Sequence, residues 1–515
     1  MTFWRKSAIV LVAACLAAQQ VSCDSSALTV QSANAFIKQN EGRVDTTYRL
    51  KYHFMAPYGW INDPNGFIYF RDEYHLFYQY NPYNSTPNKI HWGHAKSKDL
   101  IKWEHLPVAL APDQAYDQDG VFSGSSIEKD GKLYLMYTGY ANNDQVQCIA
   151  VSEDGVNFNK VSQNPVIDSS ALPPNAVAGE FRDPKVFKRG NMYYVVLVSE
   201  TKNQTGQVLL YESKDLINWN FKSILLEGNP GQGVMWECPD LYKLQGRDVL
   251  VLSPIQWPKT GNDYENTDSV VEFIGHMDWN KGTLSVENYK ELDHGLDFYA
   301  TQSLLDNKNR RVFIAWMAMW GRNFPTSDLH QGWAGAMTLP RELHLKNGKL
   351  VQKPVDEIKN YYGNPVVLKQ HTIENEVKSF KHVSGEVAVL ELTVDLRQAR
   401  HFWIDVRANK HNKTVLSYDT STQEVKLDRT NSGISMTGRE DPPVFFRKVK
   451  APLFHTGLLH LQIFLDVCSV EVFINKGEES MTDTIYPEGG NASEIRFGAE
   501  GAGVIKELYF APIVF

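Results

Sequence analysis

The segment Ser97-Lys98-Asp99-Leu100-Ile101-Lys102-Trp103 is repeated along this 515-residue chain. It recurs as Ser152-Glu153-Asp154-Gly155-Val156-Asn157-Phe158 and as Ser213-Lys214-Asp215-Leu216-Ile217-Asn218-Trp219. The aromatic residues that close the three copies are 55 and 61 residues apart. A period of this length is typical of folds in which one multi-strand unit is repeated.

A second series of segments follows the same period. Apolar runs rich in β-branched and aromatic residues occupy 74–78, 133–137, 192–196, 249–252 and 312–316. Each run is short and bounded by Gly, Asp or Asn, which favours strands over helices. Four-stranded antiparallel sheets of this size close radially into a propeller. The sequence therefore predicts an all-β fold with a five-bladed β-propeller over residues 48–355. A β-solenoid is the alternative, although its repeats are usually shorter.

The repeat stops after Leu350. We expect residues 356–370 to be a linker. Between 371 and 515, apolar and polar residues alternate in segments such as 387–394, 402–406 and 459–464, which turn residues separate. This pattern is typical of a C-terminal β-sandwich. Residues 24–47 are predicted to form a short helical lead-in.

The first 23 residues have the pattern of a secretory signal peptide. Arg5 and Lys6 precede an apolar stretch over 8–18, and small residues lead to Cys23. Because this stretch is too short to span a bilayer, we expect cleavage near Cys23 and an extracellular protein. A membrane anchor or a bacterial lipoprotein signal is the alternative. Four candidate glycosylation sites become usable after export, at Asn84, Asn203, Asn412 and Asn491.

Charge and cysteine content narrow the choice of partner. The net charge is −8 and the chain has no basic run, which argues against a nucleic-acid partner. The three cysteines beyond residue 23, an odd number, do not indicate a disulfide framework. We therefore expect a small, uncharged substrate and no membrane partner, whereas the oligomeric state is left open.

Acidic residues recur at one position of the repeat. Asp63, Ser123, Asp183, Glu237 and Asp297 are separated by 60, 60, 54 and 60 residues. Equivalent positions on innermost strands face the propeller axis, so Asp63, Asp183 and Glu237 are predicted around one funnel. Crowding raises the pKa of such acids, so that one can donate a proton while another stays ionised. The alternatives are Asx-Pro turns and a calcium cluster, but a calcium cluster would show more closely spaced ligands. No metal or cofactor is predicted.

Carboxylates beside aromatic rings form the minimum apparatus for cleaving a glycosidic bond. Aromatic faces pack against sugar C–H groups, while amides and guanidinium groups bind hydroxyls. The predicted substrate contacts are Trp60, Asn62, Gln79, Trp92, Phe122, Ser123, Arg182 and Trp333.

The sequence resembles glycoside hydrolase family 32, the β-fructofuranosidases, over about residues 45–515. The matching blocks include Trp60-Ile61-Asn62-Asp63-Pro64-Asn65-Gly66, Phe77-Tyr78-Gln79-Tyr80-Asn81-Pro82, Phe122-Ser123-Gly124-Ser125, Phe181-Arg182-Asp183-Pro184-Lys185, Trp236-Glu237-Cys238-Pro239-Asp240 and Gly332-Trp333-Ala334-Gly335. One departure is that residues 83–89 lack the Trp that the family often carries there.

The resemblance implies that Asp63 is the nucleophile, Glu237 the acid and base, and Asp183 the transition-state stabiliser. It also implies retention through a covalent fructosyl-enzyme, for which the carboxyls should lie about 5 Å apart. The export signal favours sucrose over sucrose 6-phosphate, which is made inside cells. The alternatives are an exo-inulinase or levanase, a fructosyltransferase and a non-catalytic fructan-binding protein.

Overall fold

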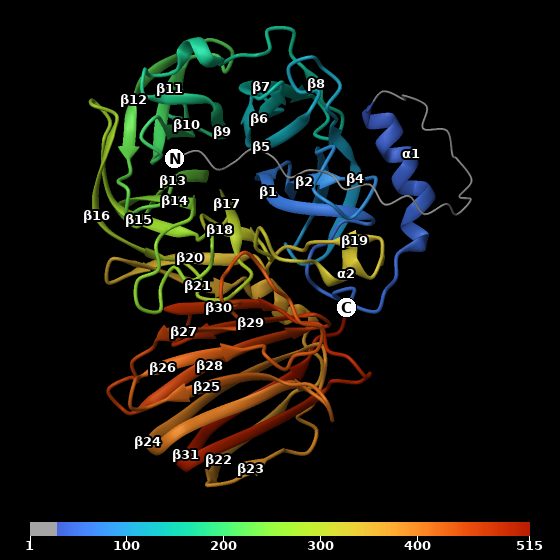
Figure 1. Cartoon of the computed structure of the whole chain (residues 1–515), viewed down its shortest axis with the longest axis vertical. Helices are drawn as coiled ribbons and strands as arrows, with labels where there is room; N and C mark the ends of the chain where they lie inside the picture. Colours follow the sequence, from blue (N-terminus) through green and yellow to red (C-terminus); the bar gives the residue numbers. More distant parts are fainter. Residues whose placement is uncertain (1–27) are drawn as a thin grey trace.

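The computed structural model describes residues 28–515 as two all-β units (Figure 1). The first is a ring of five blades, and the second is a stack of long strands that packs against one side of the ring. The predicted fold class, a five-bladed β-propeller followed by a β-sandwich, is confirmed. The signal peptide predicted over 1–23 lies outside the described residues.

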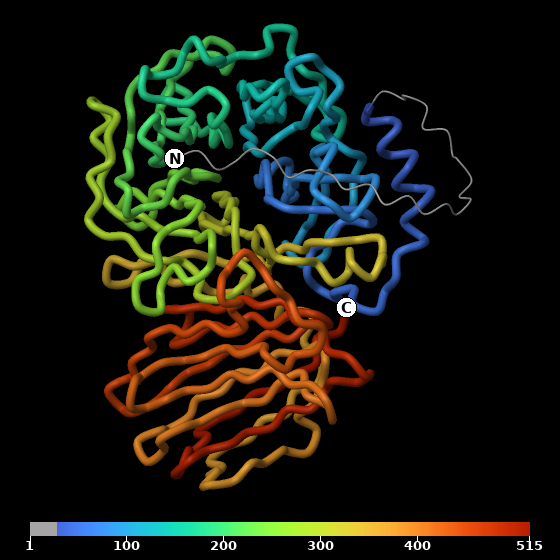
Figure 2. The backbone as a smooth tube through the Cα atoms, viewed as in Figure 1, coloured from blue at the N-terminus to red at the C-terminus, as the bar shows by residue number. Residues whose placement is uncertain are grey.

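Each blade is an antiparallel sheet whose strands follow one another in the chain (Figure 2). Blades I and II contain β1 (Gly59–Phe70), β2 (Glu73–Asn81), β3 (His91–Ser97), β4 (Trp103–Leu110), β5 (Gly120–Lys129), β6 (Lys132–Ala141), β7 (Asp144–Ser152) and β8 (Asn159–Lys160). Blades III and IV contain β9 (Ala176–Arg189), β10 (Met192–Thr201), β11 (Gly206–Ser213), β12 (Trp219–Glu227), β13 (Met235–Leu244), β14 (Arg247–Ile255), β15 (Val271–Asp278) and β16 (Thr283–Glu291). Blade V contains β17 (Tyr299–Leu305), β18 (Arg311–Trp316), β20 (Arg341–Lys346) and β21 (Lys349–Pro354).

The five apolar runs lie in β2, β6, β10, β14 and β18, the second strand of each blade. These strands have a neighbouring strand on each side and pack between adjacent blades, so that both of their faces are buried. In β10, for example, residues 193–199 are buried without interruption. This explains why the runs are continuously apolar instead of alternating.

The repeated Ser-x-Asp segment is a tight turn that leads to the fourth strand in blades I, II and III. In the first copy, Asp99 Oδ1 accepts hydrogen bonds from the backbone N–H groups of Ile101 (3.0 Å) and Lys102 (2.8 Å). Asp154 and Asp215 accept the equivalent bonds. An Asp side chain that satisfies the backbone in this way favours a turn, which is why the motif recurs.

The ring is closed by a segment that comes from the end of the propeller sequence. β19 (Trp333–Ala334) pairs in parallel with β1, with Gly59 opposite Trp333 and Trp60 opposite Ala334. The last repeat thereby covers the inner edge of the first blade, which would otherwise be unpaired.

Short helices flank these sheets. The helices are α1 (Val30–Asn40), α2 (Pro325–Asp328) and the 3-10 turns η1 (Glu41–Arg43), η2 (Ser169–Ala171) and η3 (Asp356–Tyr361). α1 lies in the segment predicted as a helical lead-in, and the Thr29 hydroxyl caps it by accepting from the Ser32 N–H (3.1 Å). Within residues 28–515, none of the helices is long and apolar enough to cross a membrane.

The second unit contains two layers joined by two long strands. Its strands are β22 (Val366–Glu374), β23 (Val377–Lys378), β24 (Ala388–Ala408), β25 (Thr414–Asp419), β26 (Glu424–Asp428), β27 (Phe446–Lys450), β28 (Leu458–Asp466), β29 (Ser469–Ile474), β30 (Glu479–Thr484) and β31 (Glu494–Pro512). β24 pairs with β31 along its length, but residues 388–395 also pair with β28 and residues 401–406 with β25. β24 and β31 therefore pass from one layer to the other.

The linker prediction of 356–370 was too long. β22 begins at Val366, and only η3 and a few residues after it connect the two units. β22 is an edge strand that pairs on one side only, with β31. Its Lys369 and Gln370 are exposed, and these two consecutive polar residues interrupt the alternation by which a strand is recognised in the sequence.

Buried ion pairs join the two units. Arg341 of β20 has no exposed surface, and its guanidinium lies 3.0 Å from Asp293 and 2.5 Å from Glu471 of β29. Glu471 Oε1 also lies 2.7 Å from Nε2 of His53. A charge buried in this way is tolerated only while its partners remain in place.

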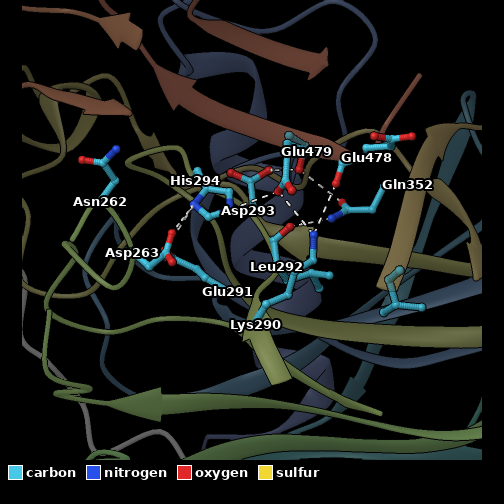
Figure 3. A network of polar contacts seen from close by, with 12 residues as sticks. Asn262, Asp263, Lys290, Glu291, Leu292, Asp293, His294, Gln352, Glu478 and Glu479 are labelled. Atoms are coloured by element: carbon cyan, nitrogen blue, oxygen red, sulfur yellow. Dashed lines mark hydrogen bonds and ion pairs between the residues drawn. The ribbon is translucent and has the colours of Figure 1, made fainter. Parts of the chain in front are cut away.

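A second polar network, around His294, lies at the same boundary (Figure 3). His294 Nε2 lies 3.2 Å from Glu479 of β30, and its Nδ1 lies 3.4 Å from Glu291. Burial opposes the charged ring, but the hydrogen bonds and charges of these two carboxylates raise the pKa of His294 to about 9. Glu291 is also bonded to Arg447 (2.8 Å), so alternating charges connect the propeller with the sandwich.

We expect Arg341→Met to destabilise the protein strongly. The substitution leaves Asp293 buried without its cation and leaves Glu471 with His53 alone, and such a loss costs about 3 to 5 kcal/mol. The free energy of unfolding is measured by chemical denaturation. Arg400→Met is the matched control, because Arg400 pairs with Glu500 on the surface, where a pair contributes at most about 1 kcal/mol. Equal effects of the two substitutions would contradict this account of the interface.

Candidate active site

A β-bulge interrupts the inner strand of every blade at an equivalent place. In β1, Asn62 and Asp63 together face Gln79 of β2. The corresponding residues are Ser123 in β5, Asp183 and Pro184 in β9, Cys238 and Pro239 in β13, and Ala300 and Thr301 in β17. An extra residue bends the strand and redirects its side chains while pairing continues on both sides. The bulges thus bring side chains from different blades to one end of the ring.

The fifth position predicted from the sequence is wrong by three to four residues. Asp297 precedes β17, and the bulge of blade V lies at Ala300 and Thr301. The carboxylate of Asp297 is bonded instead to Arg322 (3.0 Å) and to Arg429 of the sandwich. It belongs to the boundary between the two units.

A cavity of about 800 Å³ opens where the bulges meet. It is lined by the three predicted carboxylates, Asp63, Asp183 and Glu237. Five of the predicted substrate contacts also line it, namely Asn62, Gln79, Phe122, Ser123 and Arg182. Eight of the eleven predicted site residues are therefore together.

Asp63 lies at a buried point of this wall, with 9% of its surface exposed. Its Oδ2 accepts hydrogen bonds from the Ser123 hydroxyl (2.6 Å) and the Cys238 thiol (3.5 Å), and its Oδ1 accepts from the Asn62 amide (3.0 Å). Burial and the charge of Glu237 raise the pKa of Asp63, while these three donors act against the increase. The donors therefore favour the ionised carboxylate and fix its orientation.

Asp183 is joined to Asp63 through one residue. Cys238 donates its backbone N–H to Asp183 Oδ2 (2.9 Å), while its thiol donates to Asp63. The Asp183 backbone is left-handed, with φ of +61°, as is that of Cys238, with φ of +50°. Burial raises the pKa of Asp183 to about 7, although the adjacent Arg182 opposes the change.

Glu237 is held by donors on both of its oxygens. The Arg182 guanidinium donates twice to Oε1, at 2.9 and 3.2 Å, and the Tyr299 hydroxyl donates to Oε2 (2.6 Å). About 19% of the Glu237 side chain is exposed, more than in either aspartate, so it is accessible to a leaving group or to water.

Three predicted aromatic contacts do not line the cavity. Trp92 is fully buried, and its indole N–H donates to the Phe122 carbonyl (3.0 Å). Trp333 is 3% exposed, lies in the ring closure and packs against Arg49. Trp60 is 2% exposed and donates to Asn62 Oδ1 (2.8 Å), so it orients the amide that contacts Asp63. Trp60 and Trp92 thus support cavity residues from behind, whereas Trp333 belongs to the ring closure.

The cavity wall also contains residues that the sequence analysis did not predict. Trp320, which follows β18, lines the cavity and stacks on Trp60, with ring centroids 6.0 Å apart. Tyr140 stacks on Phe122, and Glu180 and Glu200 contribute two further carboxylates. Trp320 lies in an irregular segment, so no repeat position could have identified it. Glu180 precedes Arg182 by two residues. This short spacing in the sequence could have identified Glu180 as a residue of the cavity.

The glycosylation candidates differ in exposure. Asn84, Asn203 and Asn491 are exposed, whereas Asn412 is half-buried and its side-chain oxygen accepts from the Glu488 N–H (2.6 Å). The use of these sites remains a prediction.

Two family models match the chain. The model for the N-terminal domain of glycosyl hydrolases family 32 matches residues 53–354, and the model for the C-terminal domain matches residues 357–511.

Individual relatives extend over nearly the whole chain. Sucrose-6-phosphate hydrolase of Escherichia coli is 36% identical over 484 residues, covering 92% of this chain and 96% of the relative. Levanase of Bacillus subtilis is 34% identical, covering 91% of this chain and 71% of the relative. A mutant of the Bombyx mori GH32 β-fructofuranosidase, solved in complex with sucrose, is 31% identical with a TM-score of 0.79, covering 93% of this chain and 97% of that structure. From these matches and the shared fold, the chain is a glycoside hydrolase of family 32.

Proposed function

We propose that this protein is a secreted β-fructofuranosidase that hydrolyses the terminal non-reducing β-D-fructofuranoside of sucrose and related fructosides with retention. The observation that carries the proposal is the position of Asp63, Asp183 and Glu237 in the wall of one cavity. The sucrose complex of the Bombyx mori enzyme supports the choice of substrate. Secretion rests on the sequence of residues 1–23.

In the first step, the Asp63 carboxylate attacks the anomeric carbon of the fructosyl group. The bond from that carbon to the glycosidic oxygen breaks, and Glu237 transfers its proton to this oxygen, so that glucose leaves. The hydrogen bonds from Ser123 and Asn62 hold Asp63 in position for the attack.

In the second step, the ionised Glu237 removes a proton from water, which attacks the same carbon and releases Asp63. Two displacements at one carbon give net retention. Arg182 and Tyr299 donate to Glu237 and stabilise its ionised form between the steps. Asp183 lies beside this centre and offers negative charge to the oxocarbenium-like transition state.

Cleavage of fructose polymers is the second candidate. The levanase relative supports it, and the cavity wall includes neutral side chains such as Pro87, Asn143 and Trp320 that could contact a longer chain. The same active site can also transfer fructose to a sugar instead of water. Substrate comparison separates these activities.

Purified protein should release glucose from sucrose and melibiose from raffinose, with a higher kcat/KM on sucrose than on inulin or levan. Glu237→Gln should lower kcat on sucrose by about 10³-fold or more, since it removes the acid and the base. Products are quantified by chromatography, at high sucrose as well, where transfer products should remain minor.

Glu227→Gln is the control for this experiment, because Glu227 is exposed on the outer strand β12 of blade III. It should retain full activity. Absence of glucose release from sucrose would contradict the proposed substrate, and an active Glu237→Gln variant would contradict the proposed acid.

Ser123→Ala should shift the acid limb of the kcat/KM profile to higher pH. Ser123 donates to Asp63 and lowers its pKa, so loss of the hydroxyl raises that pKa and protonates the nucleophile at a higher pH. A hydrogen bond to a charged group contributes about 1.5 kcal/mol or more, which corresponds to a shift of about one pH unit.

Ser126→Ala is the matched control, since Ser126 lies on the same strand and donates to the Gly66 carbonyl. Its profile should coincide with that of the unmodified enzyme. An acid limb in Ser123→Ala that is unmoved, or moved to lower pH, would show that Asp63 does not govern it.

A further inference from the structure

Two carboxylates outside the catalytic group line the cavity. Glu180 lies on β9 and Glu200 on β10, the two inner strands of blade III. The surrounding wall is uncharged and consists of Pro87, Tyr140, Asn143, Gln145, Val177 and Trp320. The outer cavity is therefore acidic.

The positive charge in the wall is already engaged. Among the described residues that line the cavity, Arg182 is the one cationic side chain, against five carboxylates. Its guanidinium is paired with Glu180 and also with Glu237 (2.9 Å). An entering anion would have to compete with these carboxylates for the same donors.

Glu200 forms no direct ion pair with the described residues. No Lys, Arg or His of residues 28–515 lies within 4.0 Å of its carboxylate. Burial and the charge of Glu180 raise the pKa of Glu200, and the charge of Arg182 offsets this increase only in part.

The acidic wall adjoins the residue that protonates the leaving group under the proposed function. Arg182 connects Glu180 directly to Glu237, the residue that protonates the glycosidic oxygen under the proposed function. A glucose unit bound next to Glu237 would then lie near Glu180 and Glu200, and a phosphate on that glucose would approach both carboxylates.

We infer that Glu180 and Glu200 make the enzyme selective for uncharged fructosides and exclude substrates phosphorylated on the leaving group, such as sucrose 6-phosphate. This inference rests on the proposed function and adds a basis for its specificity. A phosphate monoester carries nearly two negative charges at pH 7. Like charges at a binding site discriminate strongly against the wrong ligand.

The test compares kcat/KM for sucrose and for sucrose 6-phosphate in the full-length enzyme. Sucrose should be preferred about 100-fold or more. Glu200→Gln should reduce this preference about 10-fold, and Glu200→Lys should reduce it further because a counterion is introduced. Glu227→Gln, which removes one exposed negative charge from the same blade, should leave the preference unchanged. The preference should also decrease at high salt, which screens the repulsion.

Inhibition by glucose and by glucose 6-phosphate provides a readout that does not need turnover of the phosphorylated sugar. It is measured against whichever fructoside the enzyme cleaves, and glucose 6-phosphate should bind more weakly, with the difference reduced in Glu200→Gln. Comparable kcat/KM values for the two sucroses, or tighter binding of glucose 6-phosphate, would overturn the inference and leave sucrose hydrolysis intact. Failure to cleave sucrose would instead overturn the proposed function.

Discussion

The β-bulge in the inner strand of each blade is the constraint on which the active site depends. It adds a residue where the strand reaches the end of the ring, so Asp63 and Asp183 turn toward the cavity without loss of the flanking ladder pairs. In blade IV the bulge places Cys238 between the two aspartates, with its thiol on one and its N–H on the other. Glu237 precedes this bulge, so the same kind of backbone distortion, repeated in three blades, positions the three carboxylates.

Such a cluster is electrostatically unfavourable, and the surrounding structure compensates for it. Arg182 is paired with Glu237 and lies beside Asp183, and hydroxyl, amide and thiol donors hold Asp63. The sandwich also neutralises two buried charges of the propeller. Its Glu471 pairs with Arg341, and its Arg429 pairs with Asp297. These contacts attach blade V to the sandwich, and β17 of this blade carries Tyr299, which donates to Glu237.

The sequence contains enough to predict the blades and the carboxylates, because both follow from local patterns repeated about every sixty residues. The turn at Asp99 is formed by hydrogen bonds to residues two and three positions later in the chain. β10 is continuously apolar because both of its faces are buried. The orientation of a single indole is not periodic, so Trp92 and Trp333 were predicted to contact substrate although both are buried and neither lines the cavity. Trp320 was missed because it lies in an irregular segment.

The stereochemistry of fructosyl transfer tests the central claim, that Asp63 forms a covalent intermediate, most directly. Sucrose is cleaved in the presence of methanol, which replaces water in the second step and gives a methyl fructofuranoside that cannot interconvert between anomers. Its configuration is then determined by NMR. The arrangement of Asp63 and Glu237 predicts methyl β-D-fructofuranoside, the product of two displacements. The α anomer would show a single displacement by solvent and would contradict the assignment of Asp63 as the nucleophile.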